Sequence, residues 1–149
     1  MKLYFDTSAL IKAFHQEHGT DIVIKLLSAD ENLIFVSELT RIEFKSALYR
    51  RFNNHQIGEV ELQIAIKGFN DYLQQINVEP LTTLTIEETE NLFDKYYAFG
   101  LRTLDALQLA TFTLLSDKEM QFVTADDKLC KIVETAGYIA LNPTNNTKF

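Results

Sequence analysis

The sequence has few of the residues on which several common functions depend. Cys130 is the only cysteine in 149 residues, which excludes a disulfide framework and a thiolate metal cluster. No apolar run approaches the roughly 20 residues that a membrane helix needs. The chain also starts directly in a short apolar segment rather than in a signal peptide. We therefore expect a cytoplasmic protein with no membrane partner.

Basic residues are also scarce. The chain has 14 Lys and Arg against 21 Asp and Glu, which gives a formal net charge of −7. A protein that binds nucleic acid by charge alone is normally basic, so this balance argues against simple electrostatic binding. Carboxylates gathered in a metal site would nevertheless make a chain acidic, while the bound cations reverse the local field. The positions of the acids therefore decide the question.

The remaining composition is that of one folded domain. Hydrophobic residues make up 46% of the chain and charged residues 23%, which is ordinary for a globular protein and unlike a disordered one. No internal repeat, linker, low-complexity segment or glycine-rich phosphate loop is present in the sequence. We expect a single domain over residues 1–142, followed by a polar tail at 143–149.

Short apolar runs alternate with segments of helical periodicity, which predicts an α/β fold. Strands are expected at 3–5, 33–36, 78–81, 121–124 and 138–141. Helices are expected at 8–14, 20–29, 37–52, 57–75 and 85–99, with two more that begin near 101 and 128. This order predicts a central parallel sheet with helices on both faces, a three-layer α/β/α arrangement.

Two long helices follow the second strand. Ser37 is the expected N-cap of the first, whose buried stripe includes Leu39, Ile42, Ala47 and Leu48. The core face of the second is expected at Ile57, Val60, Ile64, Phe69, Tyr72, Leu73 and Ile76. Leu62 and Ile66 widen that face, which indicates either deeper packing or the subunit interface of a homodimer. The next helix is expected to open with a capping box of Thr85 and Glu88.

Four carboxylates fall where such a fold would bring them together. Asp6 and Asp126 follow strands, at the edge where open α/β sheets bind ligands. Asp105 begins the helix that leads to the strand before Asp126, and Glu43 projects from the apolar side of its helix. Each also has a structural reading, as a helix cap, a dipole partner or a rim position that reaches water. Their convergence at one edge favours a functional reading.

Clustered carboxylates cannot all stay ionised without a compensating cation. No histidine or cysteine accompanies these four in the sequence, so the ligand set is hard oxygen. Such a set suits Mg²⁺ or Mn²⁺ better than zinc. A metal held there would lower the pKa of water and stabilise the charge of a phosphoryl-transfer transition state.

Four sequence blocks carry these acids: Phe5-Asp6-Thr7-Ser8-Ala9-Leu10, Glu43 within its helix, Leu104-Asp105-Ala106-Leu107-Gln108-Leu109-Ala110 and Phe122-Val123-Thr124-Ala125-Asp126. In order and spacing, over nearly the whole chain, they resemble the signature blocks of PIN-domain nucleases. The chain is most similar to the single-domain VapC-type toxins of bacterial toxin–antitoxin pairs. The resemblance implies an endoribonuclease toxin that depends on Mg²⁺ or Mn²⁺. Its acidic quartet would be Asp6, Glu43, Asp105 and Asp126.

The resemblance also implies a role for each of these residues and their neighbours. The metal ligands would be Asp6, Asp105 and Asp126, and Glu43 would help to position metal and water for attack on the phosphodiester. Ser8 and Thr124 match small hydroxyl residues beside the acids. Gln108 stands where many relatives have histidine and would lie behind the ligands. Asp127 is an extra acid with no assigned place.

Two macromolecular partners follow from the same resemblance. RNA would be held by a basic rim on the third helix, for which the alternative is a solvated face. The rim residues are Arg41, Lys45, Arg50 and Arg51. A small antitoxin encoded beside the toxin would place an arginine or lysine among the carboxylates. Its expected dock is the groove between the helices at 37–52 and 57–75, against Leu62 and Ile66.

Two other classes of protein share part of this pattern. A receiver-like domain also gathers acids around Mg²⁺, but it needs a phosphoacceptor Asp at the end of a middle strand. The expected third strand ends at Leu81-Thr82, without an acid. A catalytically silent PIN-like module that binds RNA or protein would use the acids to hold a structural cation. The intact quartet argues against this alternative.

Overall fold

The computed structural model describes residues 1–115 and 117–145. Its strands are β1 (Lys2–Phe5), β2 (Leu33–Ser37), β3 (Asn77–Glu79), β4 (Gln121–Val123) and β5 (Ile139–Leu141). Its α-helices are α1 (Thr7–Leu10), α2 (Thr20–Ser28), α3 (Thr40–Asn53), α4 (Glu59–Leu73), α5 (Thr83–Tyr96), α6 (Thr103–Leu114) and α7 (Asp127–Thr135). Two 3₁₀ turns, η1 (Ile11–Ala13) and η2 (Tyr97–Phe99), extend α1 and α5.

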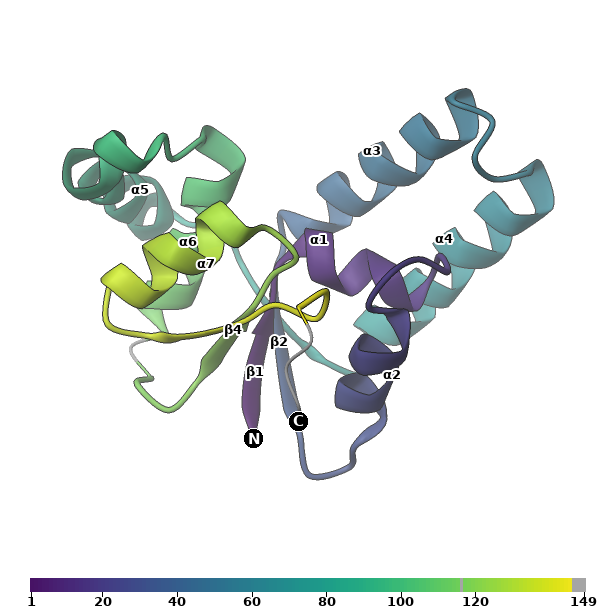
Figure 1. Ribbon diagram of the computed structural model, residues 1–149, viewed down its shortest axis with the longest axis horizontal. Helices are drawn as coiled ribbons and strands as arrows, with labels where there is room; N and C mark the ends of the chain where they lie inside the picture. The colour runs from purple at the N-terminus through teal and green to yellow at the C-terminus, as the bar shows by residue number, and fades with distance from the viewer. Residues whose placement is uncertain (116, 146–149) are drawn as a thin grey trace.

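The strands form one parallel sheet in the order β3-β2-β1-β4-β5, with β1 at its centre (Figure 1). Leu3 pairs with Ile34 of β2, and Tyr4 pairs with Phe122 of β4. A central parallel strand is covered on both faces, and the apolar residues Leu3, Tyr4 and Phe5 are accordingly all fully buried. The expected position of the N-terminal strand is confirmed.

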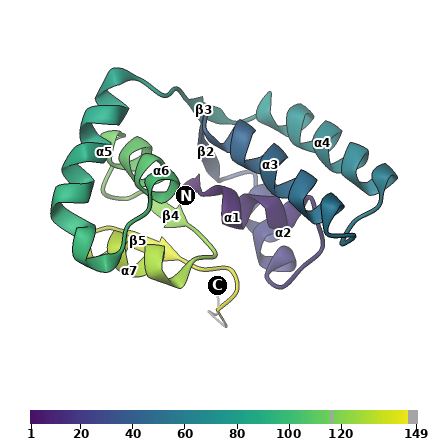
Figure 2. The ribbon, with the colours of Figure 1, turned by 90° about the horizontal axis from the view of Figure 1, so that it is seen from above.

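Helices cover both faces of this sheet, as Figure 2 shows from above. Leu3 and Phe5 point to the face covered by α1 to α4, and they share a buried cluster with residues of these helices. Tyr4 points to the opposite face and packs with residues of α5, α6 and α7. The period of two along β1 thus separates the core into two layers. The three-layer α/β/α fold is confirmed.

The two long helices differ from expectation in where they begin and in the face that they bury. Ser37 ends β2, and α3 begins only at Thr40. Ile42, expected in the core, is 68% exposed. On α4 the predicted core face is right for Phe69 and Leu73, which are buried. It was wrong in the first half of the helix, where Val60 and Ile64 are exposed while Leu62 is 2% exposed. Apolar residues lie on both sides of this helix, so periodicity alone did not identify the buried side.

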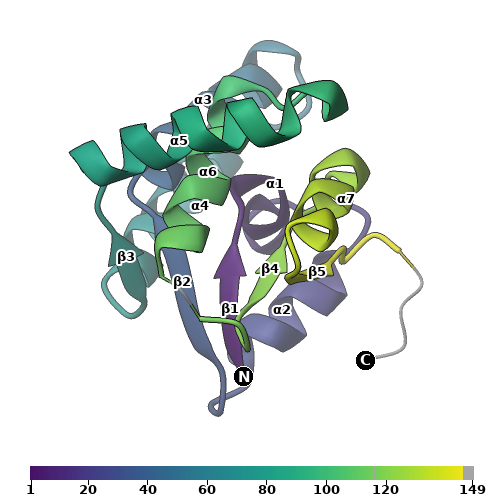
Figure 3. The ribbon, with the colours of Figure 1, turned by 90° about the vertical axis from the view of Figure 1, so that its left-hand side faces the viewer.

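The capping box of α5 lies three residues earlier than expected. The N-cap is Thr82, and Thr85 at the third helical position exchanges hydrogen bonds with it. Figure 3 shows α5 crossing over α6 on the outside of the fold. The preceding strand β3 ends at Glu79, before Pro80, rather than near Leu81. It lies at the edge of the sheet beside β2, where a proline that follows the strand is tolerated. Gly100 follows η2 at φ +70°, a left-handed conformation that favours glycine.

Some of the predicted polar tail lies against the domain. Asn142 is buried, and the backbone carbonyl of Thr144 lies 2.7 Å from Nε2 of His18. Residues 146–149 of the predicted tail lie outside the described residues. Within the described part of the chain, no helix combines the length and hydropathy that crossing a membrane requires.

Candidate functional site

Asp6 occupies the centre of the candidate site, immediately after the central strand. Its backbone N–H donates to the carbonyl of Val123 on β4, which continues the sheet by one residue. The side-chain oxygen Oδ2 accepts hydrogen bonds from Ser8 Oγ at 2.6 Å and from Thr124 Oγ1 at 2.9 Å. Burial raises the pKa of Asp6, and these two hydroxyl donors only partly offset that effect. Asp6 is therefore a carboxylate held in place without a cationic side chain.

Glu43 reaches the same edge of the sheet from the first turn of α3. Its Oε1 accepts hydrogen bonds from Gln108 Nε2 at 2.7 Å and from Thr7 Oγ1 at 3.1 Å. Burial raises the pKa of Glu43, and the charges of Asp6 and Asp105 raise it further. The apolar side of the helix thus carries an acid that neighbours other acids, as the sequence pattern predicted.

The remaining two acids open helices on the other face of the sheet. Asp105 lies in the first turn of α6, and Arg102 Nε is 3.8 Å from its Oδ2. Burial raises the pKa of Asp105, and the charges of Asp6 and Asp126 add to this rise. Asp126 is the N-cap of α7, and its Oδ1 accepts from the backbone N–H groups of Lys128 and Leu129 at 2.8 and 3.0 Å. The capping role and a position near the other acids are thus combined in one residue.

The acids form one electrostatic group but not a finished metal centre. Burial raises the pKa of Asp6, Glu43 and Asp105, and the charge of Asp6 raises the pKa of the other two further. Among the described residues, no three Asp, Glu, His or Cys side chains lie close enough to hold a metal ion as they stand. The donors are all carboxylate and hydroxyl oxygens, whose chemistry fits Mg²⁺ or Mn²⁺.

The residues expected beside the acids lie as follows. Ser8 and Thr124 both donate to Asp6, and their hydroxyls lie 3.1 Å apart. Gln108 is fully buried behind Glu43. Asp127 turns away from the acids, because its Oδ1 accepts from Nδ2 of Asn142 at 2.8 Å. The extra acid therefore fixes the C-terminal segment.

Sequence reasoning missed three hydroxyl residues that support the site. Thr7 donates to Glu43, Thr40 lies 3.1 Å from Gln108 Nε2, and the Tyr4 hydroxyl donates to Gln108 Oε1 at 2.8 Å. Thr40 precedes Glu43 by three residues on α3, so helical spacing could have indicated it. Tyr4 was read only as a core residue of β1, and no local pattern distinguishes its hydroxyl.

A groove of about 650 Å³ runs along α1, η1 and α3, and Glu43 is the member of the acidic quartet that lines it. Ser8, Glu43 and Leu104 line one end, and Arg50 and Gln56 line the other. The groove therefore places a cationic side chain about two helical turns from an acid on the same face of α3.

Of the four predicted basic rim residues, two lie in this groove. Arg50 is exposed. Arg51 is paired, because its Nη2 lies 3.4 Å from Glu17 Oε2. The other carboxylate oxygen of Glu17 forms a salt bridge with the buried Lys12. Arg50 makes no ion pair with a described residue. The accessible positive charge in the groove is thus that of Arg50.

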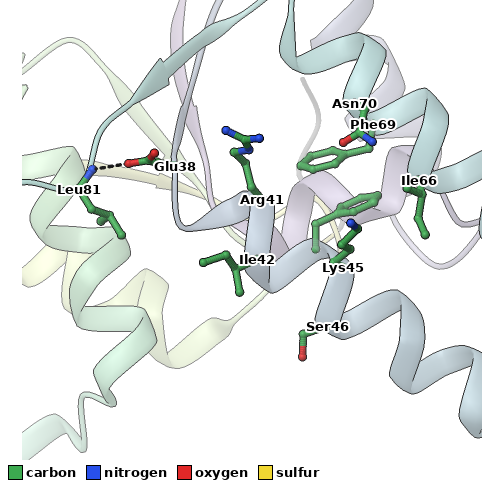
Figure 4. Close-up of a pocket in the computed structure, with 10 residues that line it drawn as sticks. Glu38, Arg41, Ile42, Lys45, Ser46, Ile66, Phe69, Asn70 and Leu81 are labelled. Carbon is green, nitrogen blue, oxygen red and sulfur yellow. Dashed lines mark hydrogen bonds between the residues drawn. The ribbon is translucent and has the colours of Figure 1, made fainter.

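Arg41 and Lys45 lie instead on a second groove, of about 610 Å³, between α3 and α4 (Figure 4). Its floor contains Phe44 and Phe69, whose rings stack with centroids 3.7 Å apart. Ile66 lines this groove from α4. Leu62 was also expected there, but it is buried in the core and does not line the groove. The basic rim is thus divided between two faces of α3.

Solved structures with the same fold include one titled a toxin–antitoxin complex and one titled a toxin. A structure titled VapBC2 from Rickettsia felis, bound to a DNA fragment from its promoter, has 16% sequence identity and a TM-score of 0.68, and the match covers 95% of this chain and 98% of that one. VapC20 from Mycobacterium tuberculosis, titled a sarcin–ricin loop cleaving toxin, has 15% identity and a TM-score of 0.70, with 95% and 99% coverage. FitAcB from Neisseria gonorrhoeae has 11% identity and a TM-score of 0.68, with 95% and 97% coverage. At these identities the likeness shows the fold.

Sequence comparison identifies the family. No curated protein sequence matches the chain. The family model described as PIN domain matches residues 3–134, which include Asp6, Glu43, Asp105 and Asp126. The chain belongs to the PIN domain family.

Proposed function

We propose that the protein is a metal-dependent endoribonuclease that acts as the toxin of a toxin–antitoxin pair. One observation carries this proposal: four acids from four elements lie at the carboxyl edge of the sheet. Burial raises the pKa of Asp6, Glu43 and Asp105, and neighbouring acids raise that of Glu43 and Asp105 further. Within the described chain, Arg102 forms the ion pair with this group, at 3.8 Å. A divalent cation would neutralise the excess charge.

Each acid has a distinct place in the proposed chemistry. Asp6, Asp105 and Asp126 would hold Mg²⁺ or Mn²⁺, which when bound supplies Lewis acidity to a phosphodiester and makes water more acidic. Glu43 would orient the attacking water, because its Oε1 is already held by Gln108 and Thr7. Ser8 and Thr124 would keep Asp6 in one rotamer through the two hydrogen bonds to its Oδ2.

The proposed RNA path is the groove that is lined by Glu43 and Arg50. VapC20, which shares the fold, is titled a toxin that cleaves the sarcin–ricin loop, and this supports RNA as the substrate class. Arg50 would contact a phosphate of the bound strand, with Arg51 beside it. Arg41 and Lys45 would not contact RNA in this path, because they line the other groove.

The second groove is the proposed dock for an antitoxin. One structure with this fold is titled a toxin–antitoxin complex, and the groove offers an aromatic floor with Arg41 and Lys45 at its edge. It runs along α3, whose first turn carries Glu43, so a partner seated there could extend to the carboxylates. A homodimer stays a prediction, for which the exposed Val60 and Ile64 on α4 are the candidate surface.

Sequencing of RNA ends tests the proposed activity. Brief expression of the wild type should arrest growth and produce new RNA ends at defined positions. Asp6→Asn keeps a hydrogen-bond acceptor for Ser8 and Thr124 but removes the charge, so neither effect should occur. Identical RNA ends from both proteins would contradict the proposal and favour a silent PIN-like binding module.

Co-expression with the small protein encoded beside the toxin tests the dock. Ile66→Asp places a charge in the second groove and should weaken rescue more than it weakens toxicity. Ile86→Asp is the matched control, because Ile86 is 52% exposed on α5 and does not line the groove. Equal rescue of the two variants would show that the partner binds elsewhere.

A further inference from the structure

Gln108 is a fully buried amide that is hydrogen-bonded at both ends. Its Oε1 accepts from the hydroxyl of Tyr4 at 2.8 Å. Its Nε2 lies 2.7 Å from Glu43 Oε1 and 3.1 Å from Thr40 Oγ1. An amide has donors only on nitrogen and acceptors only on oxygen, so these partners specify a single orientation.

We propose that Tyr4 is a positioning residue for the reaction proposed above, because its hydroxyl fixes the amide orientation through which Gln108 holds Glu43. The inference rests on the proposed function. In this arrangement Oε1 of Glu43 is held by the protein, while its Oε2 accepts no hydrogen bond from a described residue. Glu43 lines the groove and can therefore present this second oxygen to water or a cation.

The opposite amide orientation would disrupt the site. It would bring Oε1 of Gln108 against the carboxylate of Glu43, at the position where Nε2 now lies 2.7 Å away. Two acceptors at that separation repel each other. Tyr4 supports the observed orientation, because its hydroxyl donates to Oε1; in the reversed amide the hydroxyl would have to accept from the N–H group and turn its own proton elsewhere.

Tyr4 is suited to act as a fixed donor. Its ring is held between Phe122, stacked at 5.3 Å, and Phe112, edge-on at 5.5 Å. Packing between these two rings leaves the hydroxyl in one place, 2.8 Å from Oε1 of Gln108.

A histidine at position 108 sharpens the test. A neutral imidazole has one N–H donor and one bare nitrogen, so it could donate to Glu43 and accept from Tyr4 in one tautomer. Gln108→His should therefore retain the function of the wild type, whereas Gln108→Leu should not. A residue that only fills the core would favour the apolar variant instead.

The experiment compares Tyr4→Phe, Gln108→Leu, Gln108→His and the Tyr4→Phe/Gln108→Leu double variant. Cleavage of a short RNA with Mn²⁺ gives kcat and KM, and electron paramagnetic resonance gives the Mn²⁺ affinity without RNA. Tyr138→Phe is the matched control, because Tyr138 packs on Phe112 in the same aromatic cluster but lies away from Glu43. Melting temperatures identify variants that fail to fold.

We expect Gln108→Leu to lower both kcat and Mn²⁺ affinity by about 10- to 100-fold. Tyr4→Phe should lower the same two quantities by about 10-fold. Neither variant should change the KM for RNA. The double variant should be no worse than Gln108→Leu, because Tyr4 acts through Gln108. The kcat and Mn²⁺ affinity of Gln108→His and Tyr138→Phe should stay within about threefold of the wild-type values.

Two results would overturn the inference. The first is wild-type kcat and Mn²⁺ affinity in folded Tyr4→Phe, and the second is an additive loss in the double variant. A wild type that binds Mn²⁺ but cleaves no RNA would instead overturn the proposed function. The Mn²⁺ affinities of the variants would then still decide whether Tyr4 acts through Gln108.

Discussion

Two groups of carboxylates in this molecule have opposite electrostatic environments. Glu17 lies between two cations, with Lys12 Nζ at 2.9 Å and Arg51 Nη2 at 3.4 Å. Burial alone would raise the pKa of Glu17, but the hydrogen bond and charge of Lys12, together with Arg51, lower it. The protein itself therefore neutralises this carboxylate, which joins the segment after η1 to α3.

The acidic group at the sheet edge has much less compensation, since its ion pair among the described residues is that of Asp105 with the exposed Arg102 at 3.8 Å. Burial raises the pKa of Asp6. Burial also raises the pKa values of Glu43 and Asp105, and the charges of neighbouring acids raise both further. The comparison shows what distinguishes a structural acid from a candidate ligand in this fold. The structural acid is paired with cations of the chain, whereas the candidate ligand lowers stability until something external neutralises it.

Glu17→Gln should have the largest effect on stability. It would leave Lys12, a 7% exposed residue, without its ion-pair partner. Removing one member of a buried pair costs several kcal/mol, and because Glu17 is partly exposed we expect about 2–3 kcal/mol of lost unfolding free energy. Urea unfolding of the metal-free protein measures this loss. A change below about 0.5 kcal/mol would mean that the pair contributes little, as surface pairs do.

Asp105→Asn should have the opposite sign. The amide removes a charge that burial and two neighbouring acids disfavour, and this relief should exceed the lost interaction with the helix dipole. We expect the metal-free variant to be more stable than the wild type by about 0.5 kcal/mol. The same urea unfolding experiment provides the measurement. A destabilised Asp105→Asn would mean that the acids do not repel one another.

The pH dependence separates the two groups further. A carboxyl whose pKa is raised by folding contributes stability below the usual carboxyl pKa of about 4, and this contribution is lost as pH rises through the folded value. Asp6, Glu43 and Asp105 therefore disfavour folding at neutral pH, while Glu17 favours it. Between about pH 4 and 7, the melting temperature in EDTA should fall less steeply in Asp105→Asn and more steeply in Glu17→Gln than in the wild type. Parallel curves for all three proteins would contradict this assignment.

The smallest effect is expected from the divided basic rim. Arg50→Ala should weaken RNA binding a few-fold and reduce the slope of log affinity against log salt by about 0.7, the value for one contact to a single strand. Arg41→Ala is the matched control on the same helix, since Arg41 lines the other groove. Binding of a labelled RNA at several salt concentrations in EDTA measures both slopes. Equal slopes would place RNA outside the acidic groove.

The sequence predicted the sheet and the position of the acids because both depend on local pattern. The run Leu3-Tyr4-Phe5 has no polar side, so it had to be a central strand, and Asp6 had to follow it at the carboxyl edge. Glu43 was found in the same way, as an acid on an apolar stripe. These inferences need only the periods of strands and helices.

The remaining details depend on tertiary packing. Helix α4 has apolar residues on both sides, so the choice between Leu62 and Ile64 for the core depends on how the helix packs. Leu62 shares the buried cluster with Phe44 of α3, whereas Ile64 is exposed. The link between Tyr4 and Gln108 joins residues 104 positions apart. Neither leaves a local signal in the sequence. The division of the basic rim likewise required knowing which sides of α3 are open.

The most direct test of the account is to measure metal binding and RNA cleavage together in the wild type, Asp105→Asn and Glu17→Gln. The account predicts that millimolar Mn²⁺ at pH 7 raises the melting temperature of the wild type and enables it to cleave RNA. Glu17→Gln, although less stable, should keep both responses, and Asp105→Asn should lose both. RNA cleavage by Asp105→Asn at the wild-type rate, or cleavage by the wild type in EDTA, would contradict the account.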